Sequence, residues 1–339
     1  MPSGLSLKNN WIRAILGLAI GVVFFVLVLQ RTSWGQVQDI LLQTDSRWVA
    51  VAIAAYGISM VIRVERWRLL LWDVKPLSFK AISVALVVGY AMNNILPARL
   101  GELFRADFAG RRYELSRSAT IGSIALERTL DGLIVVLSLV LGRFFVSQNQ
   151  LLNTLTIAGM VLFVGIAIAL WVMSAGQMSR WMNALPEKIQ SRIVSFQSGL
   201  SAMRGSQLSR VVGFSLSVWV FEAIAHWSVL NSINVSLNWM QMLSVVGVVN
   251  LSTLIPSAPG FAGTYQYAYA FVLGLFSYST ASGIAAATAV QIFLLGSTTL
   301  IGLALYSYVN AQSLGTGRSI NSNGPAPKEI STKQGRSRR

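Results

Sequence analysis

Long apolar runs alternate with short polar segments along most of this chain. A helix needs about 20 mostly apolar residues to cross the hydrocarbon core of a bilayer. Six runs have this length and predict full membrane spans at about 11–30, 47–64, 118–146, 152–175, 208–231 and 280–310. We do not expect the first run to be a cleavable signal peptide, because no small-residue cleavage site follows it and further spans do.

The composition agrees with a membrane protein and excludes several kinds of chemistry. Of 339 residues, 54% are hydrophobic and only 12% are charged, too few charges to coat a soluble core of this size. The chain contains no cysteine and one histidine, His226, so we expect no disulfide, no metal site and no cofactor. P-loop and dinucleotide-binding motifs are also missing from the sequence.

The basic residues are distributed as in a multispanning membrane protein. The net charge is +15, but only one charged residue, Glu222, lies between Arg210 and Arg318. Basic residues gather instead in short segments between apolar runs. We therefore expect membrane lipids, and no nucleic acid, as partners; a partner enzyme or an oligomer stays open.

Two further apolar stretches, about 80–98 and 240–276, are interrupted by asparagine, proline and glycine. The segments that flank the first, 63–80 and 99–117, each contain five basic residues, and cytoplasmic loops are rich in Lys and Arg. A re-entrant hairpin that enters the membrane and returns keeps both segments in the cytoplasm. The first irregular stretch is therefore predicted to be such a hairpin.

The number of Lys and Arg residues also predicts on which side of the membrane the other loops lie. Segment 176–210 is basic and is predicted inside, whereas 147–153 and 232–239 carry no charge and are predicted outside. The tail 311–339 has six basic residues and one acidic residue and is also predicted inside, like the N-terminus. Residues 240–276 must then enter and leave from outside, as a second re-entrant hairpin or as two short crossings.

This arrangement predicts an inverted repeat within an all-α, polytopic membrane helix bundle. Ile95-Leu96-Pro97-x-x-x-Gly101 aligns with Leu254-Ile255-Pro256-x-x-x-Gly260 at an offset that also aligns the second span with the fifth. Inverted repeats with broken helices are typical of transporters. The predicted organisation is a cytoplasmic N-terminus (1–10), a transmembrane domain (11–310) with halves at about 11–146 and 152–310, an amphipathic linker helix (176–207) and a disordered basic tail (311–339).

Three charged residues, Glu127, Arg128 and Asp131, fall in the middle part of the span 118–146. They cost about 8–10 kcal/mol at a helix centre, and the apolar residues of the span contribute only about 7 kcal/mol. The spacing pairs Arg128 with Asp131, and the nearest donors for Glu127 are Arg99 and Arg105. With Glu102 these residues form a predicted cluster, either an ion network that holds the first hairpin or a substrate site.

The second hairpin and the fifth span offer weaker signals. Pro259, Gly260 and Gly263 form a small-residue turn that could present backbone N–H groups to an anion, or serve tight packing alone. Glu222 and His226 lie four residues apart and predict a polar pair, with or without a proton relay. A serine hydrolase is not supported, because the chain has no G-x-S-x-G elbow.

Three motifs together resemble the lysylphosphatidylglycerol synthase transmembrane region family, also called flippase-like membrane proteins. They are Asn94-x-x-Pro97-x-Arg99-x-Gly101-Glu102-x-x-Arg105, then Glu127-Arg128-x-x-Asp131, then Pro256-x-x-Pro259-Gly260-x-x-Gly263. The resemblance implies a multi-pass inner-membrane protein that handles phospholipid or polyprenyl-linked substrates. It departs from the bifunctional members, because no synthase domain follows the last span, and the position where the family often has a glutamate reads Tyr265-Gln266-Tyr267.

The function predicted from this resemblance is flippase-type translocation of an anionic phospholipid or a lipid-linked glycan. Arg99 and Arg105 would bind the lipid phosphate, since the planar guanidinium donates two parallel hydrogen bonds. Two alternatives stay open: a membrane-embedded transferase that uses Glu127 or Asp131 as base, and a non-transporting accessory subunit. The missing synthase domain argues against lysyl transfer.

Overall fold

The computed structural model describes residues 34–96, 99–145, 149–175, 185–204, 207–255 and 257–315. The predicted span at 11–30, Pro97, Pro256 and most of the basic tail lie outside these residues. All regular elements of the described chain are helices: α2 (Trp34–Leu42), α3 (Ser46–Leu70), α4 (Phe79–Ile95), α5 (Leu100–Tyr113), α6 (Arg117–Gly142), η2 (Arg143–Phe145), α7 (Gln150–Ser174), α9 (Glu187–Ser198), η3 (Ser201–Met203), α10 (Gln207–Ser232), α11 (Trp239–Ser252), η4 (Pro259–Phe261), α12 (Thr264–Gly274), α13 (Thr280–Val290), η5 (Gln291–Gly296) and α14 (Ser297–Gly315).

The chain forms an all-α membrane bundle, as predicted. Four helices of the described part are long and apolar enough to cross a bilayer, namely Ser46–Leu70, Gln150–Ser174, Gln207–Ser232 and Thr280–Gln312. They correspond to four predicted spans. Helix α6 is equally long at 26 residues but carries the three charged residues of the predicted cluster.

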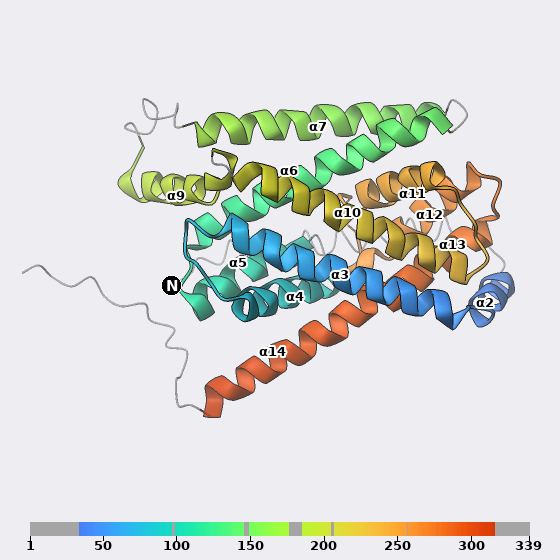
Figure 1. The fold of residues 1–339 in the computed structure, drawn as a ribbon, viewed down its shortest axis with the longest axis horizontal. Coiled ribbons are helices and arrows are strands. Elements are labelled where there is room, and N and C mark those ends of the chain that lie inside the picture. Colours follow the sequence, from blue (N-terminus) through green and yellow to red (C-terminus); the bar gives the residue numbers. More distant parts are fainter. Residues whose placement is uncertain are drawn as a thin grey trace, which may run out of the picture.

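Helices α3 and α10 run antiparallel along their length at the centre of the bundle (Figure 1). Asp45 N donates to Ser232 O at one end of the pair, and Arg66 donates to Ser215 towards the other. Helix α6 packs beside α10, and α7 covers the outer side of α6 (Figure 1). Helix α3 continues to Leu70, which is six residues beyond the predicted end of the second span.

Helices α4 and α5 form the first hairpin, and both of its ends lie at the same end of the bundle. Lys75 Nζ, just before α4, donates to Tyr113 O, the last residue of α5, at 2.9 Å. With 17 residues, α4 is about 25 Å long, less than the roughly 30 Å of a hydrocarbon core. This geometry supports the prediction that the stretch around 80–98 enters the membrane and returns.

Helices α11 and α12 form the second hairpin, which returns to the opposite end of the bundle. Ser236 N, before α11, donates to the hydroxyl of Tyr278, which follows α12, at 3.1 Å. Helix α11 has 14 residues and is about 21 Å long. A capping box of Asn238 and Gln241 fixes its start.

The packing supports the predicted inverted repeat. Helix α4 of the first hairpin packs against α14 in the second half, and α11 of the second hairpin packs against α6 in the first half. The same repeat relates α3 of the first half to α10 of the second half, and these two helices form the central pair. The hairpins thus pack across the two halves, and the loops at their tips face each other in the interior.

Candidate functional site

Two carboxylates of α6 lie one helical turn apart in the bundle interior. Glu127 is 1% exposed and Asp131 is 5% exposed. Side chains four residues apart share one face of a helix. The arginines that contact them come from α3, α5 and α6 itself, so this face ties three elements together.

Glu127 is surrounded by three arginines. Its Oε2 accepts a hydrogen bond from Arg105 Nη2 at 3.0 Å, and its Oε1 accepts one from Arg128 Nη2 at 3.0 Å. Arg66 Nη2 lies 3.5 Å from the same Oε1. The Arg105 guanidinium also stacks on the ring of Trp67 at 4.4 Å. Among the described residues, Glu127 is the one carboxylate within 4.0 Å of Arg105.

Asp131 is held from α3, α6 and α10. Arg66 donates to both of its oxygens, at 2.6 Å and 3.2 Å, in a bidentate pair. Trp219 Nε1 donates to Asp131 Oδ1 at 3.1 Å, and Arg128 Nη1 donates to Oδ2 at 3.4 Å. Arg66 has no exposed side-chain surface. Its position therefore fixes α3 against α6.

A second buried pair joins the central helices. Arg63 Nη2 of α3 donates to Glu222 Oε2 of α10 at 2.7 Å, and Ser59 donates to the same oxygen at 3.2 Å. The hydroxyl oxygen of Tyr90, on α4, accepts from Arg63 at 3.0 Å and from Arg128 at 3.0 Å. Tyr90 thereby connects the Glu222 pair with the α6 cluster.

Arg128 also forms an ion pair with Glu102 of α5, with 2.9 Å between Nε and Oε1. The whole network contains more arginines than carboxylates. It has five arginines and four carboxylates, namely Arg63, Arg66, Arg99, Arg105 and Arg128 with Glu102, Glu127, Asp131 and Glu222. One positive charge is therefore left without a carboxylate of its own.

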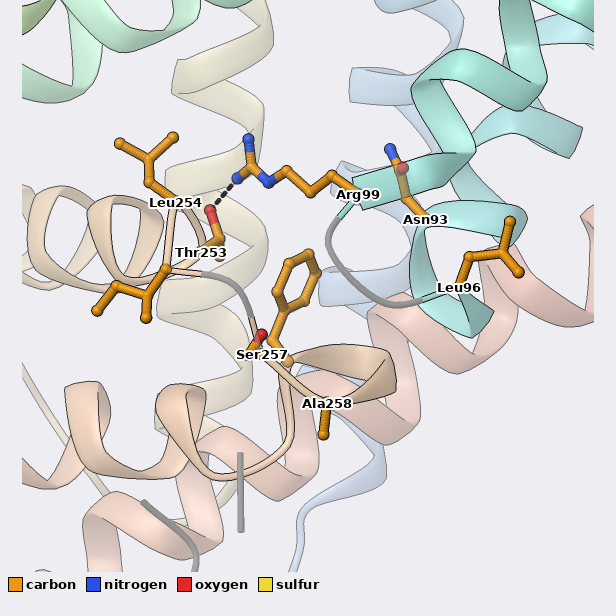
Figure 2. Close-up of a pocket in the computed structure, with 9 residues that line it drawn as sticks. Asn93, Leu96, Arg99, Thr253, Leu254, Ser257 and Ala258 are labelled. Carbon is orange, nitrogen blue, oxygen red and sulfur yellow. Dashed lines mark hydrogen bonds between the residues drawn. The ribbon is translucent and has the colours of Figure 1, made fainter. Parts of the chain in front are cut away.

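That unmatched charge belongs to Arg99, at the start of α5. Among the described residues no carboxylate lies within 4.0 Å of its guanidinium, which instead donates to Thr253 Oγ1 at the end of α11 (Figure 2). The guanidinium also lies 5.9 Å from the centre of the Phe261 ring. The backbone of Arg99 is left-handed, with φ 56°, an uncommon conformation for a side-chain-bearing residue.

Arg99 lies between two small cavities at the meeting point of the hairpins. One cavity, of about 60 Å³, is lined by both hairpin tips, including Asn93, Thr253 and Ser257 (Figure 2). The other, of about 70 Å³, is lined by Arg99, Arg128 and Asp131. The unmatched guanidinium therefore lines both cavities, and the second cavity brings it beside Arg128 and Asp131 of the α6 cluster.

The turn of the second hairpin is built on glycine and glutamine. Gly260 and Gly263 adopt φ 65° and 85°, values that glycine reaches without steric cost. Gln266 Oε1 accepts from Gly263 N at 2.9 Å. Gln291, in the π-helical turn η5, accepts from Gln266 Nε2 at 2.7 Å and donates to Gly260 O at 2.7 Å. The turn is thus bound to the last span.

The first hairpin is bound to the same region. Asn94 Nδ2 donates to Leu295 O at 3.2 Å and to Thr299 Oγ1 at 2.9 Å, at and just beyond η5. A π-helical turn inside a helix is rare and often marks a functional site. In this protein it is the segment to which both hairpin tips bond.

The sequence model of the lysylphosphatidylglycerol synthase TM region matches residues 14–302 of this chain. The chain belongs to that family. A UPF0104 membrane protein of Methanothermobacter thermautotrophicus is 23% identical over 81% of this chain and 88% of its own length. The UPF0104 membrane protein MJ1595 of Methanocaldococcus jannaschii is 22% identical, over 73% of this chain and 80% of its own. The glycosyltransferase AglD of Haloferax volcanii is 24% identical over 80% of this chain and half of that protein.

Family membership agrees with a polytopic membrane protein. Arg99 of the first motif lines one cavity with the turn of the third motif and another with Arg128 and Asp131 of the second. Glu102, Arg105, Glu127, Arg128 and Asp131 lie in a single network, as the sequence predicts. Arg99 does not pair with Glu127, because it points across to the second hairpin. Gly101 packs so closely on α4 that a Cβ there would lie 2.2 Å from the backbone N of Asn93.

Glu222 and His226 do not bond each other, although their spacing allows it. Glu222 pairs with Arg63, and His226 Nδ1 lies 2.9 Å from the Tyr269 hydroxyl on α12. A charged guanidinium on the neighbouring helix binds a carboxylate more strongly than a neutral imidazole does. The two residues therefore stabilise different helix contacts.

Arg63 and Arg66 were not predicted as site residues, because the sequence places them with the charges of a cytoplasmic loop. Both lie inside α3 and are 4% and 0% exposed. A usable signal exists, because Ser59, Arg63 and Arg66 fall at spacings of four and three and so share one helix face. Gln291 was missed as well, and no spacing in the sequence marks its link to Gln266.

Proposed function

We propose that this protein moves a phosphate-bearing lipid, either a phospholipid or a polyprenyl-linked lipid, between the two leaflets of the cell membrane. The observation that carries the proposal is Arg99, the one arginine of the network without a carboxylate within 4.0 Å among the described residues. An ionisable group at membrane depth is costly unless it has a partner or a function. A lipid phosphate is an anion that is always present in a membrane.

The other charges then serve to hold the site in shape. A polar headgroup does not cross hydrocarbon unaided, so a translocase supplies a polar space at mid-depth that opens to each leaflet in turn. Arg66 and Arg105 are buried against Glu127 and Asp131 and are committed to these partners. In this proposal they fix the wall of the site, and Arg99 alone receives the phosphate.

Entry of a headgroup requires the hairpins to separate. Cavities of about 60 and 70 Å³ hold only a few water molecules, whereas sites for small organic ligands measure roughly 300–1,000 Å³. The Arg99–Thr253 bond joins the two hairpins directly. In the proposed cycle, the phosphate replaces Thr253 as the partner of Arg99 while α4–α5 and α11–α12 move apart.

The proposed orientation follows the charge pattern. The turn after α3 and the end of α5 meet at one end of the bundle, where Lys75 bonds Tyr113 and where Arg111, Arg112 and Arg117 also lie. Helix α9 packs on α6 at that end. We propose that this end, with both termini, faces the cytoplasm, because Lys and Arg are enriched in cytoplasmic loops.

Reconstitution into liposomes tests this function. The purified protein is inserted into vesicles that contain a headgroup-labelled phospholipid in one leaflet or a labelled polyprenyl phosphate. The proposal predicts exchange of the label between leaflets, faster than in protein-free vesicles and without covalent change in the lipid. Equal exchange in both preparations for both lipid classes contradicts it.

One relative favours a second candidate function. AglD is named as a glycosyltransferase, and the region that matches this chain is half of that protein. The alternative is therefore that this protein is a transferase acting on a lipid-linked sugar, or assists such an enzyme. Mass spectrometry of the lipids recovered from the same vesicles separates the two, because a transferase leaves a lipid of changed mass.

A further inference from the structure

A groove lies between the end of α3 and the start of α10, away from the buried network. It has a volume of about 440 Å³ and is lined by Arg68, Leu69 and Trp72 from α3 and its following turn, and by Arg210 and Phe214 from α10, together with Glu65 and Gln207. We call it the Arg210 groove. Its volume falls within the range of ligand sites, unlike the two cavities at Arg99.

The helical spacing explains why these residues face one another. Residues 65, 68 and 69 lie at steps of three and four on α3, with Trp72 in the turn that follows, and 207, 210 and 214 have the same spacing on α10. Because the helices are antiparallel, the end of α3 meets the start of α10. Arg63 and Arg66 lie on another face of α3, which points to the interior.

The groove carries an unmatched positive charge. Arg68 Nη2 lies 2.8 Å from Glu65 Oε2, so these two charges compensate each other. Arg210 is exposed, and no carboxylate among the described residues lies within 4.0 Å of it. It belongs to the first turn of the 26-residue helix α10, whose positive dipole end favours an anion.

The apolar side of the groove fits a ligand that is not purely ionic. Leu69 and Phe214 are partly buried, and Trp72 is 49% exposed. Tryptophan is enriched at the level of lipid headgroups, where one side of the ring is apolar and the other polar. The groove thus places a free guanidinium next to exposed apolar surface at the end of two membrane helices.

We propose that the Arg210 groove binds a phosphate ester, with Arg210 and Arg68 on the phosphate and the apolar side chains against the glycerol or acyl part. A phosphodiester carries one negative charge and a phosphomonoester carries up to two, so either ester is attracted by the unpaired positive charge of the groove. The source is a lipid headgroup or a soluble phosphate ester. This site shares no lining residue with the Arg99 cavities and does not depend on the proposed transport.

Native mass spectrometry of the whole protein in detergent tests the site. Phosphatidylglycerol is titrated in one series, and sn-glycerol 3-phosphate in a second. The variants are Arg210→Gln, Phe214→Ala and, as a matched control, Arg192→Gln, which removes an exposed arginine of α9 outside the groove. Melting in detergent shows that each variant folds.

We expect Arg210→Gln to weaken binding by about tenfold or more, because hydrogen bonds to charged groups are the stronger kind, whereas Arg192→Gln leaves binding unchanged. A lipid source predicts that Phe214→Ala also weakens phosphatidylglycerol binding and that glycerol phosphate neither binds nor competes. A soluble source predicts Arg210-dependent binding of glycerol phosphate with no effect of Phe214→Ala. Equal affinities of Arg210→Gln and Arg192→Gln in both series overturn the proposal.

Discussion

Replacing Glu127 by glutamine tests the buried network most sharply. The substitution keeps the size and shape of the side chain and removes its negative charge. Three arginines approach that carboxylate, but they differ in the carboxylate partners that they keep after the substitution. Arg66 and Arg128 still bind Asp131, whereas Arg105 loses its one carboxylate partner among the described residues.

The expected cost follows from this asymmetry. Leaving a buried charge uncompensated costs about 3–5 kcal/mol, and Arg105 is 2% exposed. Glu127→Gln is therefore expected to destabilise the protein by about that amount. Arg105→Gln should cost less, because Glu127 keeps Arg66 and Arg128 within 3.5 Å. The double variant should recover about 1–3 kcal/mol relative to the sum of the single effects.

Reversible unfolding in mixed detergent micelles, followed by circular dichroism, measures these free energies. Asp107→Asn is the matched control: its partners Arg111 and Arg117 lie at 2.7 Å, but the pairs are exposed and worth about 0–1 kcal/mol. A cost of Glu127→Gln no greater than that of the control would contradict a buried Glu127–Arg105 pair, and so would effects of Glu127→Gln and Arg105→Gln that add without coupling.

Two further predictions concern packing and topology. Gly101→Ala should destabilise the first hairpin by about 1–3 kcal/mol, because the added Cβ would meet the α4 backbone. Gly57→Ala is the control: a Cβ there has no atom within 4 Å, so this variant should be neutral or stabilising in detergent melts. Single cysteines, introduced into a chain that has none, should react with an impermeant maleimide only from outside at Asn149 and Ser236, and only from inside at Ser78, Ser116, Ser201 and Ser313. Labelling of Ser116 from outside and Ser78 from inside would contradict the re-entrant hairpin.

The hydrophobic pattern predicts the bundle well because span length and apolarity are local properties. Positions of α7, α10 and the α13–α14 segment agree with the predicted spans within a few residues. Helix α3 ends at Leu70, later than the predicted span, because charged residues such as Arg63 and Arg66 after an apolar run indicate a loop by composition alone. In a membrane helix, an arginine beyond the apolar run is either in water or paired inside the protein, and composition does not distinguish the two.

The candidate site was predictable only where its contacts are local to one helix. Spacing along one helix brings Arg128 to Asp131, and the cost of burying Glu127 requires a cation from elsewhere. Which cation binds depends on how α3, α5 and α6 cross, and no single helix determines that. Arg99 and Arg105 lie six residues apart, yet one reaches α11 and the other α6. The link of both hairpins to η5 also depends on a local π-helical turn without a sequence signal.

We propose that Arg99 recognises the phosphate of a transported lipid. The most direct measurement is the rate of leaflet exchange in liposomes for the wild type, Arg99→Lys and Arg99→Ala, with melting in detergent as the folding control. Lysine keeps the charge but lacks the planar fork, so the account predicts that both variants fold and that both lose at least about tenfold in rate. Exchange at the wild-type rate in Arg99→Ala, with normal folding, would contradict it.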